Sequence, residues 1–193
     1  MKPIILASQS PRRKQLLEWA EVPFTIKISP VEEVFPEYLP AGEAPVYIAR
    51  QKALAVKQQE SSGHIILAAD TVVVLDGRII GKPASREEAI AILTDLSGKQ
   101  HRVITGVVIL DGDREIAFSD ITLVDFHPLT QEQIIFYVDK YQPYDKAGAY
   151  AIQEWIGVVG IRSVAGDFYN VMGLPVSRVV QALESINKND EIK

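Results

Sequence analysis

The sequence predicts an α/β fold, and the alternation of strand-like and helix-like segments along the chain is the main reason. The clearest strand is residues 65–74, a nearly continuous apolar run of the kind found in strands covered on both faces. The clearest helix begins at Ser10-Pro11, because serine is a good N-cap and proline suits the first helical position. At 193 residues and 47% hydrophobic content, the chain can form one domain or two closely packed lobes.

The other elements are predicted from the same signals. Helices are expected at residues 10–20, 45–59, 85–96 and 130–140 and from Pro175 onward, and strands at 4–7, 22–28, 78–80, 102–110, 115–126 and 158–164. Asp76-Gly77 predicts a hairpin turn, and Ser85 with Glu88 predicts a capping box. Residues 29–42 and 145–153 are expected to be loops, and the small residues of the second are typical of a loop that approaches a ligand closely.

Composition excludes several functional classes. The formal net charge of −5 argues against stable nucleic-acid binding, which normally needs a basic face. The chain has no cysteine, so it has neither disulfides nor thiolate metal sites or nucleophiles. No apolar run approaches the ~20 residues of a membrane span, and the N-terminus has no signal-peptide layout. We expect a cytoplasmic protein that does not bind membranes.

The first turn of the N-terminal helix carries an unusual charge pattern. Arg12, Arg13 and Lys14 follow the polar Ser8-Gln9 loop, although cations are disfavoured at the positive end of a helix. The same end attracts phosphate through its unpaired amides. A solvated basic turn is the alternative, but the sequence offers no local compensation, so we interpret the segment as a phosphate-binding site. On this interpretation, Arg13→Ala should leave stability unchanged or slightly raised.

Asp70 interrupts the most apolar strand. A carboxylate there is costly unless it is paired, protonated or bound to a metal, so it is a candidate catalytic residue; a satisfied structural aspartate is the alternative. Lys82 follows the returning strand of the hairpin, and Lys52 lies at the edge of the buried side of its helix. Glu33 lies in a Glu- and Pro-rich loop where plain solvated charge is the alternative. The three histidines show no metal-ligand or triad spacing and are assigned no role.

Several separated motifs together resemble the Maf family of nucleoside triphosphate pyrophosphatases over essentially the whole chain. They are Leu6–Arg13, Ala69–Val73, Gly81-Lys82-Pro83, Thr105-Gly106-Val107 and Asp145–Gln153. The ending Ala-Tyr-Ala-Ile-Gln resembles the branch that hydrolyses dTTP and UTP rather than the 7-methyl-GTP branch. The resemblance implies a single Maf-like domain over residues 1–193, with a bent mixed β-sheet flanked by helices and two lobes around a central cleft. It also implies a homodimer, a divalent metal and an association with arrest of cell division.

Residue roles carried over from the family complete the prediction. Asp70 is the implied general base, and Glu33 joins it at the metal. Substrate choice is implied for Arg12, Thr71 and Gln153. The implied phosphate-binding residues are Ser8, Arg12, Arg13, Lys52 and Lys82.

The chemistry is consistent with these roles. Four cations suit a triphosphate, and two carboxylates suit a hard cation such as Mg²⁺ or Mn²⁺. Hydrolysis at the α-phosphate, with water activated by Asp70, then yields a nucleoside monophosphate and pyrophosphate. Without cysteine or a patterned serine–histidine pair, direct hydrolysis is favoured over a covalent intermediate. The alternatives are a phosphotransferase, although P-loop and kinase motifs are absent, and a non-enzymatic nucleotide-sensing regulator of cell division.

Overall fold

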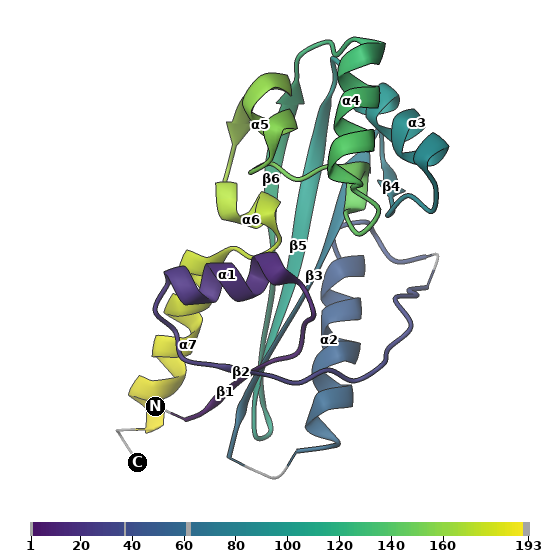
Figure 1. Cartoon of the computed structure of the whole chain (residues 1–193). Coiled ribbons are helices and arrows are strands. Elements are labelled where there is room, and N and C mark those ends of the chain that lie inside the picture. The colour runs from purple at the N-terminus through teal and green to yellow at the C-terminus, as the bar shows by residue number, and fades with distance from the viewer. Residues whose placement is uncertain (1, 37, 61–62, 191–193) are drawn as a thin grey trace. The chain divides into compact units, whose positions relative to one another are not determined.

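The computed structural model describes residues 2–36, 38–60 and 63–190, and it has the predicted α/β architecture (Figure 1). Its strands are β1 (Ile4–Leu6), β2 (Thr25–Ile26), β3 (Ile65–Leu75), β4 (Arg78–Ile80), β5 (Gln100–Asp111), β6 (Arg114–Phe126) and β7 (Ile161–Ala165). Its helices are α1 (Pro11–Trp19), α2 (Ala44–Lys57), α3 (Arg86–Leu96), α4 (Gln131–Tyr141), α5 (Trp155–Gly160), α6 (Phe168–Met172) and α7 (Val176–Asp190), with a 3-10 helix η1 (Ala147–Ala149).

The described strands form one mixed sheet, as the family resemblance implies. The strand order is β2-β1-β3-β5-β6-β7, and β4 pairs with β3. β1 runs parallel to both β2 and β3, whereas the β3–β4 and β6–β7 pairs are antiparallel. The hairpin prediction is confirmed: Leu75 pairs with Arg78, and both Asp76 and Gly77 have the positive φ of a tight hairpin turn.

The chain forms two compact units. Unit 1 contains Met1–Asp70, Thr105–Asp120 and Gly173–Lys193, and unit 2 contains Thr71–Ile104 and Ile121–Met172. The chain passes from one unit to the other within β3, β5 and β6. Asp70 is therefore the last residue of unit 1 on β3, and Thr71 is the first residue of unit 2.

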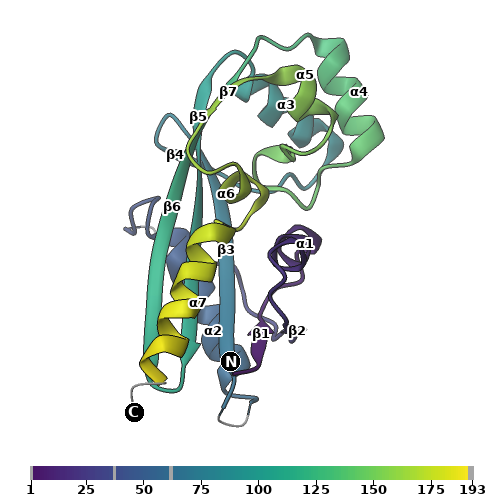
Figure 2. The same ribbon diagram turned by 90° about the vertical axis from the view of Figure 1, so that its left-hand side faces the viewer.

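In unit 1, helices α2 and α7 lie on opposite sides of the strands (Figures 1 and 2). The α2 side is an aliphatic core in which alternate strand residues such as Ile66 and Ala68 pack with Ala49 and Ala53 of the helix. Both faces of β3 are covered, so Ile65 to Asp70 are all buried. The apolar composition of this strand follows from that double burial.

Gly106 allows α2 to approach β5 closely. A Cβ atom at this position would lie 2.2 Å from the backbone nitrogen of Val46 and 2.4 Å from the carbonyl carbon of Pro45. Only glycine leaves room for backbone this near, so the Thr105-Gly106-Val107 motif fixes the start of α2 against the sheet.

In unit 2, α3 packs against α4 (Figure 1). The buried residues of α3 are Ala89, Leu93 and Leu96, and those of α4 are Ile134, Tyr137 and Val138. α4 begins with a complete capping box between Thr130 and Gln133. At α3 the box is only half as predicted: Ser85 caps the Glu88 amide, but the Glu88 carboxylate accepts from the Ala84 amide.

Two predicted strands are wrong in part, and one short helix was not predicted. The strand expected at residues 158–164 is the helix α5 followed by the shorter strand β7. The helical turn buries Ile156 and Gly160 while leaving Val158 83% exposed, and a run of apolar residues does not distinguish this arrangement from a strand. The strand expected at 22–28 is reduced to β2, and α6 was not predicted.

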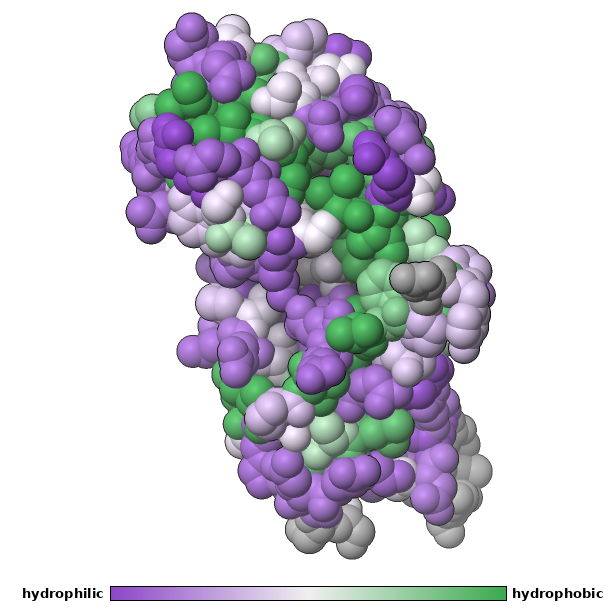
Figure 3. All heavy atoms as spheres, turned by 90° about the vertical axis from the view of Figure 1, so that its right-hand side faces the viewer, coloured by the Kyte–Doolittle hydropathy of each residue, from purple (hydrophilic) through white to green (hydrophobic). Residues whose placement is uncertain are grey.

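The surface of the described residues mixes polar and apolar groups. Figure 3 shows hydrophobic residues exposed between hydrophilic ones on one face. Among the described residues, no helix combines the length and the apolar character that crossing a membrane requires.

Candidate functional site

The N-terminus of α1 is built as the sequence predicts. Ser10 has an extended backbone, and its hydroxyl accepts from the Arg13 amide at 3.5 Å, with Pro11 in the first helical position. No acidic residue lies in the first turn of the helix. The helix therefore presents arginines where its dipole favours an anion.

The Arg13 side chain, however, is buried, with only 8% of the residue exposed. Its Nε donates to the Gly173 carbonyl at 2.8 Å, and a terminal nitrogen donates to Ser8 Oγ at 3.1 Å. Burial lowers the pKa of the guanidinium from its ordinary value, the Asp70 and Glu33 carboxylates oppose this, and Arg12 adds to it. Arginine stays charged in proteins all the same, so unit 1 holds a buried positive charge here.

These contacts argue for a different expectation from the unchanged stability that the sequence predicts for Arg13→Ala. We expect the substitution to lower the free energy of unfolding of the ligand-free protein by about 1–3 kcal/mol, because it leaves the Gly173 carbonyl and Ser8 hydroxyl without this donor. Chemical denaturation measures the loss. Arg12→Ala is the matched control, since Arg12 is only half-buried, and an equal loss in both variants would contradict the structural role of Arg13.

Asp70, Lys52 and Glu33 form one cluster in unit 1. The Lys52 ammonium donates to Asp70 Oδ1 and to Glu33 Oε1, each at 2.7 Å. Asp70 is buried, with 7% of the residue exposed, whereas the Glu33 side chain is 42% exposed. The implied base Asp70, the implied metal ligand Glu33 and the implied phosphate-binding residue Lys52 thus lie within one ion-pair network.

Two periodicities produce this cluster. Asp70 has the same parity along β3 as Ile66 and Ala68, so its side chain lies on the face that packs against α2. Lys52 follows Ile48 and Ala49 by one helical turn, which places it beside the buried face of α2. A buried carboxylate and a lysine consequently meet where the apolar core ends.

The two carboxylates suit a metal that arrives with its substrate. The described residues contain no group of three or more His, Asp or Glu side chains able to hold a metal ion. Magnesium is usually held by one or two carboxylates together with substrate phosphates and water. Glu33 and Asp70 provide two carboxylates whose oxygens already converge on one positive charge, so they fit such an ion.

In unit 2, Lys82 lies in a segment held by the Asp145–Gln153 loop. The Gly148 amide donates to the Gly81 carbonyl at 3.1 Å. Gly148 has φ +72°, and a Cβ there would lie 2.8 Å from a Val73 methyl group, so this position requires glycine. Lys82 itself is exposed, and Thr71 is half-buried.

Gln153 lies at the tip of a tight turn. The Glu154 amide donates to the Ala151 carbonyl at 3.1 Å, which makes residues 151–154 a β-turn with Gln153 at its third position. Ala151 and Ile152 are buried, whereas Gln153 is exposed. Its side-chain amide can therefore meet a ligand.

One buried polar pair, which the sequence did not predict, joins this loop to β5. His101 of β5 and Tyr150 are hydrogen-bonded, with 2.7 Å between Nε2 and the phenol oxygen, and both rings pack edge-on against Phe126. Burial lowers the pKa of His101 to about 4, although the Asp125 carboxylate opposes this, and burial raises the pKa of Tyr150. Strand parity was the available signal, since His101 alternates with exposed Gln100 and Arg102.

We expect His101 to make stability depend on pH. Its pKa is about 4 when folded and about 6.5 when unfolded, so the unfolded chain binds more protons between these values. The contribution is complete above pH 6.5 and is lost as the pH falls toward 4, by about 3 kcal/mol in total. His101→Gln should flatten denaturation midpoints measured from pH 7 to pH 4. Exposed His127→Gln is the control, and an unaltered profile in His101→Gln would contradict the assignment.

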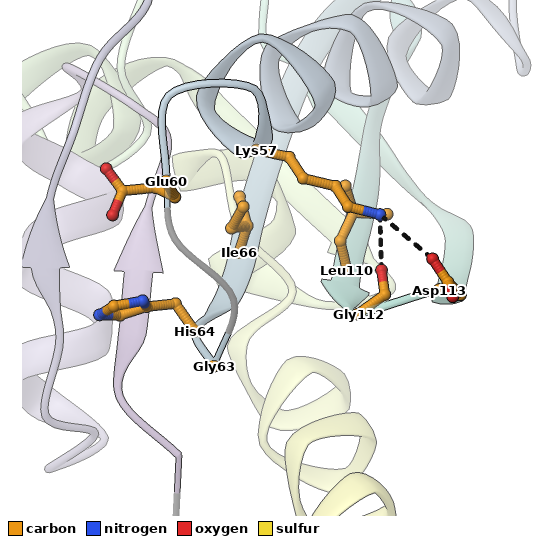
Figure 4. Close-up of a pocket in the computed structure, with 8 residues that line it drawn as sticks. All are labelled: Lys57, Glu60, Gly63, His64, Ile66, Leu110, Gly112 and Asp113. Atoms are coloured by element: carbon orange, nitrogen blue, oxygen red, sulfur yellow. Dashed lines mark hydrogen bonds and ion pairs between the residues drawn. The ribbon is translucent and has the colours of Figure 1, made fainter.

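A separate pocket in unit 1 lies away from the predicted residues. It is lined by Lys57, Glu60, Gly63, His64, Ile66, Leu110, Gly112 and Asp113 (Figure 4). The Lys57 ammonium is used structurally there, since it donates to the Gly112 carbonyl at 2.6 Å. None of the predicted site residues lines this pocket.

The predicted site residues thus fall into two groups. Ser8, Arg12, Arg13, Glu33, Lys52 and Asp70 belong to unit 1, where contacts join Ser8 to Arg13 and Lys52 to both carboxylates. Thr71, Lys82 and Gln153 belong to unit 2, where the Asp145–Gln153 loop contacts the segment before Lys82.

The chain is similar to known proteins over most of its length. A protein of Cytophaga hutchinsonii named dTTP/UTP pyrophosphatase is 52% identical over 183 residues, 95% of this chain and 84% of that protein. One of the same name from Bacteroides thetaiotaomicron is 46% identical over 184 residues, 95% of each chain. The structure of a HAM1 protein from Coxiella burnetii has the same fold, with a TM-score of 0.51, 18% identity and coverage of 96% of this chain and 100% of that chain. The sequence matches the family described as Maf-like protein over residues 3–186. The chain therefore belongs to the family of Maf-like proteins.

Proposed function

We propose that this chain is a nucleoside triphosphate pyrophosphatase that prefers dTTP and UTP and cleaves at the α-phosphate. The observation that carries the proposal is the buried Asp70 carboxylate in contact with Lys52, in the same unit as an arginine-bearing helix N-terminus. The relatives named dTTP/UTP pyrophosphatase support the choice of substrate.

In this proposal the cations hold the phosphates and Asp70 acts as the base. Arg12, Arg13, Lys52 and Lys82 neutralise the triphosphate, with Ser8 as a further hydrogen-bonding group. Asp70 accepts the proton of the attacking water, and the bond from the α-phosphorus to the bridging oxygen breaks. Pyrophosphate leaves, and its charge is balanced by the same cations.

Glu33 and Asp70 would hold a divalent cation, Mg²⁺ or Mn²⁺. Such an ion, when bound, polarises the phosphate and lowers the pKa of water. We also propose that residues 1–193 act as a single domain, that the protein is a homodimer, and that it is cytoplasmic and binds no nucleic acid stably. The proposed preference for dTTP and UTP does not depend on the domain organisation, the oligomeric state or the location of the protein.

Product analysis tests the proposed function. The protein is incubated with dTTP, UTP, CTP, GTP or ATP, with Mg²⁺ or Mn²⁺, and products are separated by anion-exchange chromatography. The expected products are the nucleoside monophosphate and pyrophosphate. A phosphorylated acceptor would instead indicate a phosphotransferase, and unchanged nucleotide a non-enzymatic nucleotide sensor. Either result would overturn the proposal.

We expect Gln153 to read the base. Its amide can pair with the N3–H donor and a flanking carbonyl of uracil or thymine. The flipped amide also matches cytosine, so Gln153 discriminates between the two bases only where neighbouring groups fix its orientation. Gln153→Ala should therefore narrow the UTP-over-CTP ratio of kcat/KM, removing about 1–3 kcal/mol of discrimination. Steady-state kinetics of both proteins measure the ratio. A ratio that does not change would show that Gln153 does not contact the base.

A further inference from the structure

We propose that Tyr137 is a positioning residue for nucleobase selection, acting through Gln153. This inference rests on the proposed function and adds a residue of α4 to the specificity machinery. All the contacts that support it lie within unit 2.

The Tyr137 phenol holds both sides of the turn that carries Gln153. Its oxygen accepts from the Ala151 amide at 3.1 Å, and its O–H donates to the Glu154 carboxylate. These two partners are the first and last residues of the β-turn. One buried phenol, on a residue with no exposed surface, thus fixes the two ends of a turn whose third residue is exposed.

Two other contacts restrict the same turn. Gly157 lies so close to the Ile152 carbonyl that a Cβ there would be 1.7 Å from the oxygen, so α5 packs directly on the turn backbone. The Lys146 ammonium lies 3.7 Å from the other Glu154 carboxylate oxygen and 2.7 Å from Asp145. Glu154 is therefore held from two sides, and the position of the Gln153 backbone follows from that of its neighbours.

Removing the phenol oxygen should loosen the turn without disturbing the core. The Tyr137 ring stacks on Tyr141 with centroids 5.0 Å apart, and phenylalanine retains this packing. The buried Ala151 amide would lose its acceptor, which is costly unless the backbone moves to reach water. Base discrimination depends on where the Gln153 amide lies, so discrimination should decrease in this variant. The proposed base, Asp70, belongs to the other unit, so kcat should be nearly unchanged.

The test is a double-mutant cycle on the UTP-over-CTP ratio of kcat/KM. Tyr137→Phe should narrow this ratio by about 3- to 10-fold, mainly through a higher KM for UTP, with kcat nearly unchanged. In the Gln153→Ala background the same substitution should leave the ratio unchanged, because the group that it positions is gone. Tyr141→Phe removes the same atom from the stacked neighbour and is the matched control.

Amide hydrogen exchange provides a second readout that does not depend on activity. Tyr137→Phe should speed exchange of the Ala151 amide by about 3- to 10-fold, whereas Tyr141→Phe should not. Both the narrowed ratio and the faster exchange are required, and absence of either in an active enzyme overturns the assignment.

If Tyr137→Phe does not fold, Glu154→Ala takes its place in the kinetic cycle. This substitution removes the carboxylate that accepts from the phenol, while Lys146 keeps Asp145 as its partner. Failure of the proposed function is seen separately, as a wild-type protein that hydrolyses neither dTTP nor UTP.

Discussion

Replacing Asp70 with asparagine is expected to reduce kcat/KM for UTP by about 10²–10⁴-fold. The amide is nearly the same size as the carboxylate but is a poor proton acceptor, so the proposed water activation is lost. The Lys52 ammonium keeps Glu33 as an anionic partner, so the fold should persist. Initial-rate kinetics with Mg²⁺ measure the loss, and circular dichroism confirms that the variant is folded.

Asp113→Asn is the matched control for this experiment. Asp113 is exposed in the β5–β6 turn, so the same chemical change there should leave the rate unaltered. Near wild-type turnover by a folded Asp70→Asn protein would contradict the role of Asp70. It would then favour the structural alternative, in which the carboxylate only balances the charge of Lys52.

Replacing Gly106 with alanine is expected to lower the free energy of unfolding by about 3 kcal/mol or more. The added methyl group would meet backbone atoms of Val46 and Pro45 at 2.2–2.6 Å. Backbone cannot rotate aside as a flexible side chain can, so the start of α2 must move away from β5. Lys52 lies on this helix, and the displacement should also reduce turnover by moving its ammonium from Asp70.

Urea denaturation and kinetics together measure the two effects. Gly42→Ala is the matched control, because a Cβ at Gly42 would meet nothing within 4 Å. A Gly106→Ala protein as stable as the Gly42→Ala protein would show that the close approach of α2 to β5 is not required.

Elements with a strong local signal were predictable from sequence. The apolar run 65–74 predicts β3 because a strand that is buried on both faces carries apolar side chains on both faces. Ser10-Pro11 predicts the start of α1 because serine is the N-cap and proline suits the first helical position. Asp70 was found for the same reason, as the one charge in that run. Its roles with Glu33 and Lys52 came from family resemblance, and the kinetic experiments remain their test.

Features that depend on distant contacts were not predictable. The buried Arg13 side chain donates to the Gly173 carbonyl, 160 residues away in sequence, and first-turn rules alone do not predict this contact. The error at α5 has a different origin, because a short apolar run fits a buried helical turn as well as a strand. Tyr137 is a buried position of α4, and helical periodicity alone does not show that its phenol accepts from the Ala151 amide.

The double ion pair of Lys52 has a consequence for the thermodynamics of ligand binding. A free lysine side chain samples many rotamers, and ordering it costs about 1.5–2 kcal/mol. Here two carboxylates at 2.7 Å already restrict those rotamers in the ligand-free protein, so the entropy loss occurs on folding rather than on encounter with a triphosphate. If Lys52 holds a phosphate as proposed, its ammonium would bind with a smaller entropic penalty than an unrestrained surface lysine would carry.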